Sequence, residues 1–393
     1  MIFDQFIKAT FGYWSQYLNT VSKLISENQV YVDGGGKALY PTILLCTETK
    51  NFFIAELIGA SPNYQQLTVK RHKESSIDRY FNQFDTHISD PVIKIDNGKN
   101  HRFENIMLAQ QSDKEQVEKR FPFVKFARWS GLHRIGGKGT PVLIGENSLS
   151  ATFLNCILIN THNEAVRVKN ILYMTVINKS LSKPRYLEEL PSKITWGDNL
   201  MGVSTCSNEV AEGLVLAGHF SNLFLMNKLH ETTIGEFLKT HPEILKRALG
   251  AKKFITEAFL PWIEKADFNN DNATNPDLLI EREDGYYDIY DLKTAALDKI
   301  SLTKGKRARR RFIDYVSEGI AQLANYKEYF NYPANQKLAW DKYQIKINNP
   351  KLVLVVGSFE NSNYTEIEEA CRPYKDVITV IDYDTLMQLL IRR

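Results

Sequence analysis

One short segment, residues 276–293, constrains the fold of this chain more than any other. It begins with Pro276-Asp277 and the apolar run Leu278–Ile280, turns at Asp284-Gly285, and resumes with the aromatic and β-branched run Tyr286–Tyr290. Such runs on both sides of an Asp-Gly pair are typical of a β-hairpin with a tight turn. The sequence therefore predicts two antiparallel strands, with the start of the first strand next to the end of the second.

Charged residues stand at both open ends of this hairpin. Asp277 begins the first strand, and Asp291 and Lys293 end the second. Side chains two residues apart on a strand point to the same face, so Asp291 and Lys293 project together. Carboxylates are ligands for Mg²⁺ or Mn²⁺, and an ammonium group beside them suits phosphodiester hydrolysis. We predict a metal site here; the alternative is an ordinary solvated hairpin, because both short patterns are common.

The residues on either side of the hairpin add further polar groups. Upstream, the apolar pattern of Phe254–Leu260 predicts a helix that leaves Glu257 facing the hairpin as a third acid and metal ligand. Downstream, a helix predicted over Ile313–Phe330 carries Gln322 and Tyr326, whose spacing of four residues places them on one face. Four such elements in order are far rarer by chance than one.

This order of motifs resembles the PD-(D/E)xK nucleases, in particular their RecB-like branch. Residues 237–245, 352–357 and 377–386 are similar to parts of the nuclease domain of the Shedu anti-phage defence proteins. The resemblance implies a PD-(D/E)xK nuclease fold, a divalent metal (Mg²⁺ or Mn²⁺), and a DNA endonuclease acting on phage DNA. It also implies a homo-oligomer such as a tetramer, with a variable N-terminal region that regulates or targets the nuclease.

The same resemblance assigns roles to individual side chains. Metal binding falls to Asp277 and Asp291, catalysis to Lys293, and support of the site to Gln322 and Tyr326. An intact Asp277, Asp291 and Lys293 set argues against a degenerate site.

Several alternatives stay open from the sequence. Glu264 and Asp267 lie on the same segment as Glu257 and could supply the third acid instead. The substrate could be RNA or branched DNA, as in a restriction or repair nuclease. A module of the same fold that binds nucleic acid without cleaving it is a further possibility.

The length of 393 residues exceeds one ordinary domain, and a hydrophobic fraction of 43% is sufficient for packed cores. We predict an α/β chain, α+β overall, in which a β-rich N-terminal sensing or regulatory domain (residues 1–210) precedes a nuclease domain (residues 211–393) with a mixed sheet flanked by helices. The chain has no run of about 18 apolar residues and no signal-peptide pattern at its start, which predicts a cytoplasmic protein without a membrane span.

Patterns in the N-terminal half support its β-rich character. A helix is predicted over Phe3–Ser26, and strands are predicted at residues 141–144, 153–159 and 171–177. Residues 92–99 contain an Asn-Gly pair that follows the β-branched residues Val92, Ile93 and Ile95, which predicts a hairpin.

Positive charge is concentrated in one stretch although the net charge is only +3. Residues 304–311 hold six cations between the Asp-x-Lys strand and the Gln-x-x-x-Tyr helix. Contacts from such a stretch to phosphates would be independent of sequence and sensitive to salt. Its position next to the predicted metal site favours a DNA-backbone role over an ordinary solvated basic loop.

Overall fold

A computed structural model describes most of the chain. The described residues are 1–29, 36–75, 77–80, 93–95, 100–104, 107–108, 117, 119, 142–144, 150–162, 165–193, 200–225, 231–266, 271–374 and 377–390. They form two compact units, one of Met1–Asn222 with Leu389–Arg393, the other of Leu223–Gln388. The domain boundary between residues 210 and 211 stays a prediction.

The first unit is built on a seven-stranded sheet of order β4-β2-β3-β10-β9-β6, in which β7 also pairs with β9. Its strands are β2 (Ile43–Glu48), β3 (Phe52–Ile58), β4 (Thr68–Lys73), β6 (Asn100–Glu104), β7 (Met107–Leu108), β9 (Ser150–His162) and β10 (Ala165–Asn178). Two-stranded sheets join β1 (Lys37–Leu39) with β11 (Ser204–Cys206) and β5 (Ile93–Ile95) with β8 (Val142–Ile144). The helices are α1 (Phe3–Ser26), α2 (Ile77–Tyr80), α4 (Lys183–Lys193) and α5 (Asn208–Leu225), whose last residues belong to the second unit.

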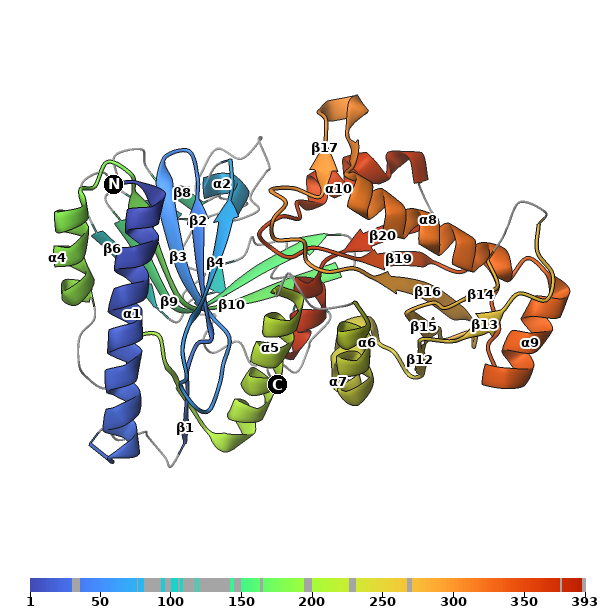
Figure 1. The fold of residues 1–393 in the computed structure, drawn as a ribbon, viewed down its shortest axis with the longest axis horizontal. Helices are drawn as coiled ribbons and strands as arrows, with labels where there is room; N and C mark the ends of the chain where they lie inside the picture. Colours follow the sequence, from blue (N-terminus) through green and yellow to red (C-terminus); the bar gives the residue numbers. More distant parts are fainter. Residues whose placement is uncertain are drawn as a thin grey trace. The chain divides into compact units, whose positions relative to one another are not determined.

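Helix α1 covers one face of this sheet (Figure 1). Its aromatic residues enter the core: Phe6 stacks on Phe53 of β3, and the rings of Trp14 and Tyr173 of β10 lie 4.4 Å apart. Phe6 and Trp14 are fully buried, so the apolar face of α1 is held by packing. The predicted helix and the predicted β-rich character of this half are confirmed.

The predicted hairpin at residues 92–99 falls mostly outside the described residues, which include only 93–95 of this stretch. Strand β5 pairs in parallel with β8, and β6 pairs in parallel with β9. The residues of the expected turn, 96–99, lie outside the described part. Both strands pair with segments that lie far along the chain, and the residues of a local turn do not determine such pairing.

The second unit contains a five-stranded sheet of order β12-β15-β16-β19-β20 (Figure 1). Its strands are β12 (Phe254–Thr256), β15 (Leu278–Glu281), β16 (Tyr287–Leu292), β19 (Leu352–Val355) and β20 (Ile378–Ile381). The pairs β12-β15 and β15-β16 are antiparallel, whereas β16-β19 and β19-β20 are parallel. The predicted mixed sheet flanked by helices is therefore confirmed, and the chain is α+β overall.

Shorter strand pairs and helices complete this unit. They are β13 (Leu260–Pro261) with β14 (Ala273–Thr274), β17 (Thr303–Lys304) with β18 (Arg311–Phe312), α6 (Glu231–Thr240), α7 (Pro242–Leu249), α8 (Asp314–Tyr329), α9 (Pro333–Tyr343), α10 (Tyr364–Cys371), and the 3-10 helices η3 (Arg307–Arg309), η4 (Arg372–Tyr374) and η5 (Tyr383–Leu390).

Helix α8 packs on β16 and β19, and this contact forms the main core of the unit. Ile289 of β16 and Leu354 of β19 share a core cluster with Val316 and Ile320 of α8. The neighbouring strand residue Tyr290 is also buried, although it points to the other face. Both faces of these strands are therefore covered, and β19 is accordingly a continuous apolar run.

The predicted helix over residues 254–260 is wrong. Phe254 and Ile255 belong to β12, which pairs with Ile280 and Leu279 of β15. An edge position on the hairpin offers these apolar residues backbone hydrogen bonds and burial that an isolated helical turn lacks.

Candidate active site

The hairpin of β15 and β16 forms as the sequence predicts. Gly285 adopts the left-handed conformation, with φ +81°, and the Asp284 carboxylate accepts hydrogen bonds from Tyr286 N and Arg282 Nε, both at 3.1 Å. Leu278 then pairs with Tyr290 at the open end. The turn thus sets a register that brings the predicted charged residues to the same edge of the sheet.

Asp291 and Lys293 form an ion pair at the end of β16. Lys293 Nζ lies 3.0 Å from Asp291 Oδ2, and the two residues are only 5% and 1% exposed in that order. Removing two charges from water costs several kcal/mol per ion unless close partners compensate. An ion pair buried to this degree is therefore weak support for stability and better support for function.

Asp277 is attached to the same strand end. Its Oδ2 atom accepts a hydrogen bond of 2.7 Å from the backbone nitrogen of Leu292, the residue between Asp291 and Lys293. This bond fixes the Asp277 carboxylate where β15 begins and β16 ends. The structure therefore brings together Asp277, Asp291 and Lys293, as the hairpin register predicts.

Helix α8 adds a hydroxyl and an amide to this cluster. The Tyr326 hydroxyl donates a long hydrogen bond of 3.4 Å to Asp291 Oδ1. One turn earlier, the Gln322 Oε1 atom is buried and has no hydrogen-bond partner among the described residues. A spacing of four residues places both side chains on one stripe of α8, so Gln322 offers an unused oxygen ligand on the face that meets Asp291.

A glycine lets α8 approach this closely. A Cβ atom at Gly319 would lie 3.2 Å from Asp291 Oδ2 and 2.7 Å from Leu354 Cδ1. Any side chain at this position would press on both the carboxylate and the core. Gly319 was not among the residues predicted for the site, because a glycine inside a helical pattern usually signals little by itself.

Glu257 occupies a different setting from the predicted one. It follows β12 in a bend with φ +50°, its side chain is exposed, and its backbone nitrogen donates to the Asp277 carbonyl at 3.0 Å. Of the two alternatives, Glu264 Oε2 accepts from Ala334 N at 3.3 Å, and Asp267 lies outside the described residues. Within the described ranges, no three His, Cys, Asp or Glu side chains are arranged to hold a metal.

Sequence comparison finds a similarity over part of the chain. Residues 228–387 match the family model described as Shedu protein SduA, C-terminal. Over this region, which is about two-fifths of the chain, the sequence is similar to the Shedu family. The matched region, called the Shedu region below, contains every residue predicted for the site, and this similarity supports a role in anti-phage defence. Among curated proteins, none matches the chain significantly.

Two residues of the Shedu region hold the backbone that follows Lys293. The Tyr383 hydroxyl donates a hydrogen bond of 2.5 Å to the Lys293 carbonyl, and the Asn361 amide donates to the carbonyls of Ala295 and Ala296. Tyr383 and Asn361 are 0% and 2% exposed. Sequence reasoning missed both, because they follow β20 and β19 and reach Lys293 only through the parallel sheet.

Asp288, the other aspartate of β16, contacts groups that hold the sheet together. Asp288 accepts a hydrogen bond of 2.8 Å from Lys351 N, at the start of β19, and lies 3.4 Å from Arg282 Nη1. Burial raises the pKa of its carboxyl, while these two neighbours oppose the increase. Asp288 therefore ties β16 to β19, whereas Asp291 faces α8.

None of the helices in the described ranges combines the length and the apolar character that crossing a membrane requires.

Proposed function

We propose that the Shedu region is a metal-dependent nuclease of the PD-(D/E)xK type that hydrolyses DNA, within a chain that acts in defence against phage. One observation carries the proposal: the buried Asp291–Lys293 ion pair, with Asp277 attached to the backbone between them. Titratable groups that are buried beside a charge partner cluster at functional sites. The proposed DNA substrate rests on the family resemblance.

The strand arrangement supports this assignment. Three antiparallel strands, β12, β15 and β16, are followed by α8 and then by β19, which pairs in parallel with β16. In the PD-(D/E)xK fold, the acidic and lysine residues come from the central hairpin and the supporting residues from the next helix. The positions of Lys293 and Tyr326 agree with that pattern.

The residues present fit a hard divalent cation. Mg²⁺ prefers oxygen ligands and is commonly held by one or two carboxylates, with waters and substrate phosphates completing its shell. Asp277 and Asp291 would hold it, and the Gln322 Oε1 atom is a further oxygen donor on the adjoining face of α8. Glu257 stays the least supported ligand. When bound, such a metal polarises a phosphoryl oxygen and lowers the pKa of water.

The protein groups have separate tasks in the proposed reaction. Lys293 places a positive charge at the reacting phosphate, where negative charge grows in the transition state. Its ammonium is held by Asp291, and Asp291 is in turn oriented by the Tyr326 hydroxyl. Tyr383 and Asn361 fix the backbone after Lys293, so that its side chain has little freedom to move away.

We further propose that residues 1–210 sense or regulate, that residues 211–393 form the nuclease domain, and that the protein works as a homo-oligomer in the cytoplasm. Size-exclusion chromatography with light scattering tests the oligomer. Contacts to DNA phosphates carry no sequence information, so any preference for a DNA sequence would have to come from other contacts of the protein.

Removal of the metal is expected to abolish cleavage. Purified wild-type protein should convert supercoiled or linear DNA to shorter or nicked products with Mg²⁺ or Mn²⁺, and should not do so with excess chelator, because the ligands are oxygens. Gel electrophoresis of supercoiled, linear and closed relaxed DNA, with RNA and branched DNA in parallel, measures this. Cleavage that is equal with and without chelator would contradict the proposed chemistry, whereas cleavage of RNA alone would change only the substrate.

The Tyr383→Phe variant should slow cleavage at unchanged metal affinity. It removes the hydrogen bond to the Lys293 carbonyl, and leaving a buried carbonyl unsatisfied costs about 1–3 kcal/mol of unfolding free energy. Tyr364→Phe is the matched control, because the Tyr364 hydroxyl shares a buried hydrogen bond with Thr385. Both variants should lose similar stability in denaturant titrations, and only Tyr383→Phe should lose rate. Equal cleavage rates in the two variants would contradict a positioning role for Tyr383.

A further inference from the structure

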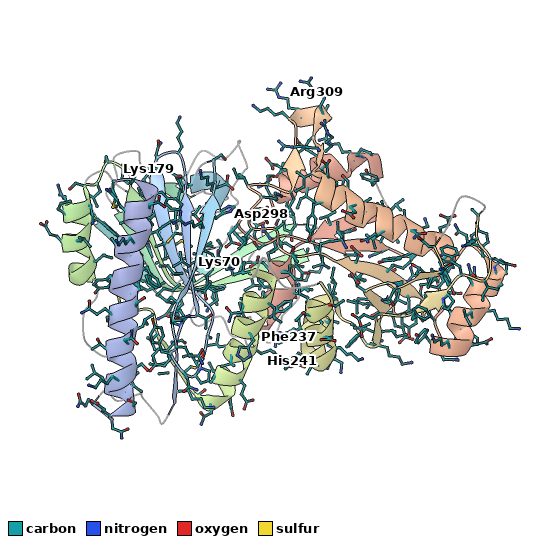
Figure 2. All side chains as sticks on the ribbon, viewed as in Figure 1. Lys70, Lys179, Phe237, His241, Asp298 and Arg309 are labelled. Atoms are coloured by element: carbon teal, nitrogen blue, oxygen red, sulfur yellow. The ribbon has the colours of Figure 1, made fainter. Side chains whose placement is uncertain are left out.

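A basic hairpin projects from the Shedu region. We define it as residues 303–312, comprising β17, η3 and β18, in which Thr303 pairs with Phe312 and Lys304 with Arg311. Figure 2 shows Arg309 at its tip, away from the central sheet. Six of its ten residues are lysine or arginine, so its charge is unusual for a chain of net charge +3.

Two of the six cations serve the fold. Arg310 Nη1 lies 2.9 Å from Glu366 Oε1, and Arg310 Nε donates to Glu369 Oε2 at 2.6 Å, which fastens the hairpin to α10. Lys304 Nζ lies 2.6 Å from Asp314 Oδ1 at the start of α8. Phe312 is buried in the core of the unit. The base of the hairpin is therefore held by charge pairs and by packing.

The other four cations point to solvent. They are Lys306, Arg307, Arg309 and Arg311. All four side chains are exposed, and none has an ion-pair partner among the described residues. These four cations lie within six residues and repel one another, and the exposed Asp314 carboxylate, which pairs with Lys304 and attracts Arg311, offsets only part of this cost. A polyanion bound on this surface would offset it.

The backbone of the tip is closely defined. Gly305 has φ +88°, and a Cβ atom there would lie 2.5 Å from the Arg309 carbonyl oxygen. Arg309 N donates to the Lys306 carbonyl at 3.2 Å, and Arg310 N donates to the Arg307 carbonyl at 2.9 Å. This closed turn presents its cations from a fixed backbone, so less conformational entropy is lost on binding.

The base of the hairpin adjoins the catalytic lysine. Leu302 N donates to the carbonyl of Asn361, whose amide holds the backbone after Lys293. The Tyr315 hydroxyl, just past the hairpin, accepts a hydrogen bond of 2.9 Å from Thr294 N. Leu302 on one side of the hairpin is thus linked through Asn361 to the residues that follow Lys293, and Tyr315 on the other side is bonded to them directly.

We propose that Lys306, Arg307, Arg309 and Arg311 bind the phosphate backbone of duplex DNA and hold it beside the site of Asp291 and Lys293. The choice of DNA rests on the proposed function, while the cationic surface stands on its own geometry. Arginine and lysine contacts to phosphates carry no sequence information but strengthen binding in proportion to the counterions that they release. The hairpin therefore contributes affinity and placement of the substrate rather than sequence selectivity.

The test measures DNA binding of the full chain without metal, so that no cleavage is needed. Fluorescence anisotropy with a labelled duplex over a salt series compares wild type with a variant in which all four cations are replaced by Gln (K306Q, R307Q, R309Q and R311Q). The variant should bind at least tenfold more weakly at low salt. Its slope of log affinity against log salt should be smaller by up to roughly 3.6, from about 0.9 for each phosphate contact.

A second variant controls for net charge alone. It replaces four exposed lysines outside the hairpin by Gln (K8Q, K239Q, K252Q and K337Q). This control should keep most of the wild-type affinity and slope. Equal losses in both variants would overturn the proposal, and so would unchanged binding in the hairpin variant. Loss of binding only to vesicles containing anionic lipid, or a change in oligomer mass without a change in DNA affinity, would also overturn it.

The outcome is separable from that of the proposed nuclease. Hairpin-dependent binding by a protein that cuts no DNA would leave this inference standing and contradict the nuclease. Metal-dependent cleavage together with DNA binding that does not depend on the hairpin would support the nuclease and overturn this inference.

Discussion

Neutralising the buried ion pair is expected to abolish DNA cleavage while the protein stays folded. The double variant Asp291→Asn/Lys293→Met removes both charges and keeps the approximate shapes of the side chains. Cleavage should fall by about a thousandfold or more, because losing one preorganised electrostatic group alone costs roughly 10²–10³ in rate. Initial rates on supercoiled DNA with Mg²⁺, together with thermal unfolding, measure the two effects.

The single variants serve as controls for the double one. Asp291→Asn or Lys293→Met alone leaves one buried charge without its partner, which costs about 3–5 kcal/mol of unfolding free energy. Both singles should therefore be inactive and less stable, whereas the double variant should be inactive and close to wild type in stability. A double variant with wild-type rates would remove Asp291 and Lys293 from the catalytic site.

Gly319→Leu is expected to damage the fold and the site together. The new side chain would start 2.7 Å from Leu354 Cδ1 and 3.2 Å from Asp291 Oδ2, in a core without spare space. Overpacking of this kind costs about 1–3 kcal/mol, and the upper end applies here because strand and carboxylate must both yield. Denaturant titration and hydrogen exchange of the α8 amides should show the loss, and cleavage should fall with it.

Gly12→Leu is the matched control for this change. Gly12 also lies within a helix, α1, but its side is open, with no atom within 4 Å of an added Cβ. Replacing a helical glycine there should be neutral or stabilising by up to about 1 kcal/mol. Similar stability in the Gly319 and Gly12 variants would show that α8 can move away from β16 at little cost.

Local patterns were sufficient where neighbouring residues decide the structure. The Asp284-Gly285 turn, with apolar runs on both sides, predicted the β15-β16 hairpin and hence the meeting of Asp277 with Asp291. The helical spacing of residues 313–330 predicted α8 to within one residue at each end, so that Gln322 and Tyr326 lie on one stripe. In both cases a period of two or of 3.6 residues carries the information.

Prediction failed where the partner is distant in the chain. Residues 254–260 have an apolar spacing that also fits a helix, yet pairing with β15 makes Phe254–Thr256 a strand and leaves Glu257 in a left-handed bend. Of the stretch 92–99, only residues 93–95 are described, and they pair in parallel with β8. Short apolar runs are ambiguous by themselves, and burial against another strand decides between the possibilities.

The sequence by itself determined the chemistry of the site: two acids and a lysine on one hairpin, a glutamine and a tyrosine one helical turn apart, and a concentrated positive charge between them. Only the tertiary structure decided that Gly319 admits α8 to Asp291, that Tyr383 and Asn361 hold the backbone after Lys293, and which of the six cations face solvent. Turn and helix periods act over a few residues. Parallel strand pairing and buried hydrogen bonds join distant residues, such as Lys293 and Tyr383, which are 90 positions apart, and only the free energy of the packed core selects them.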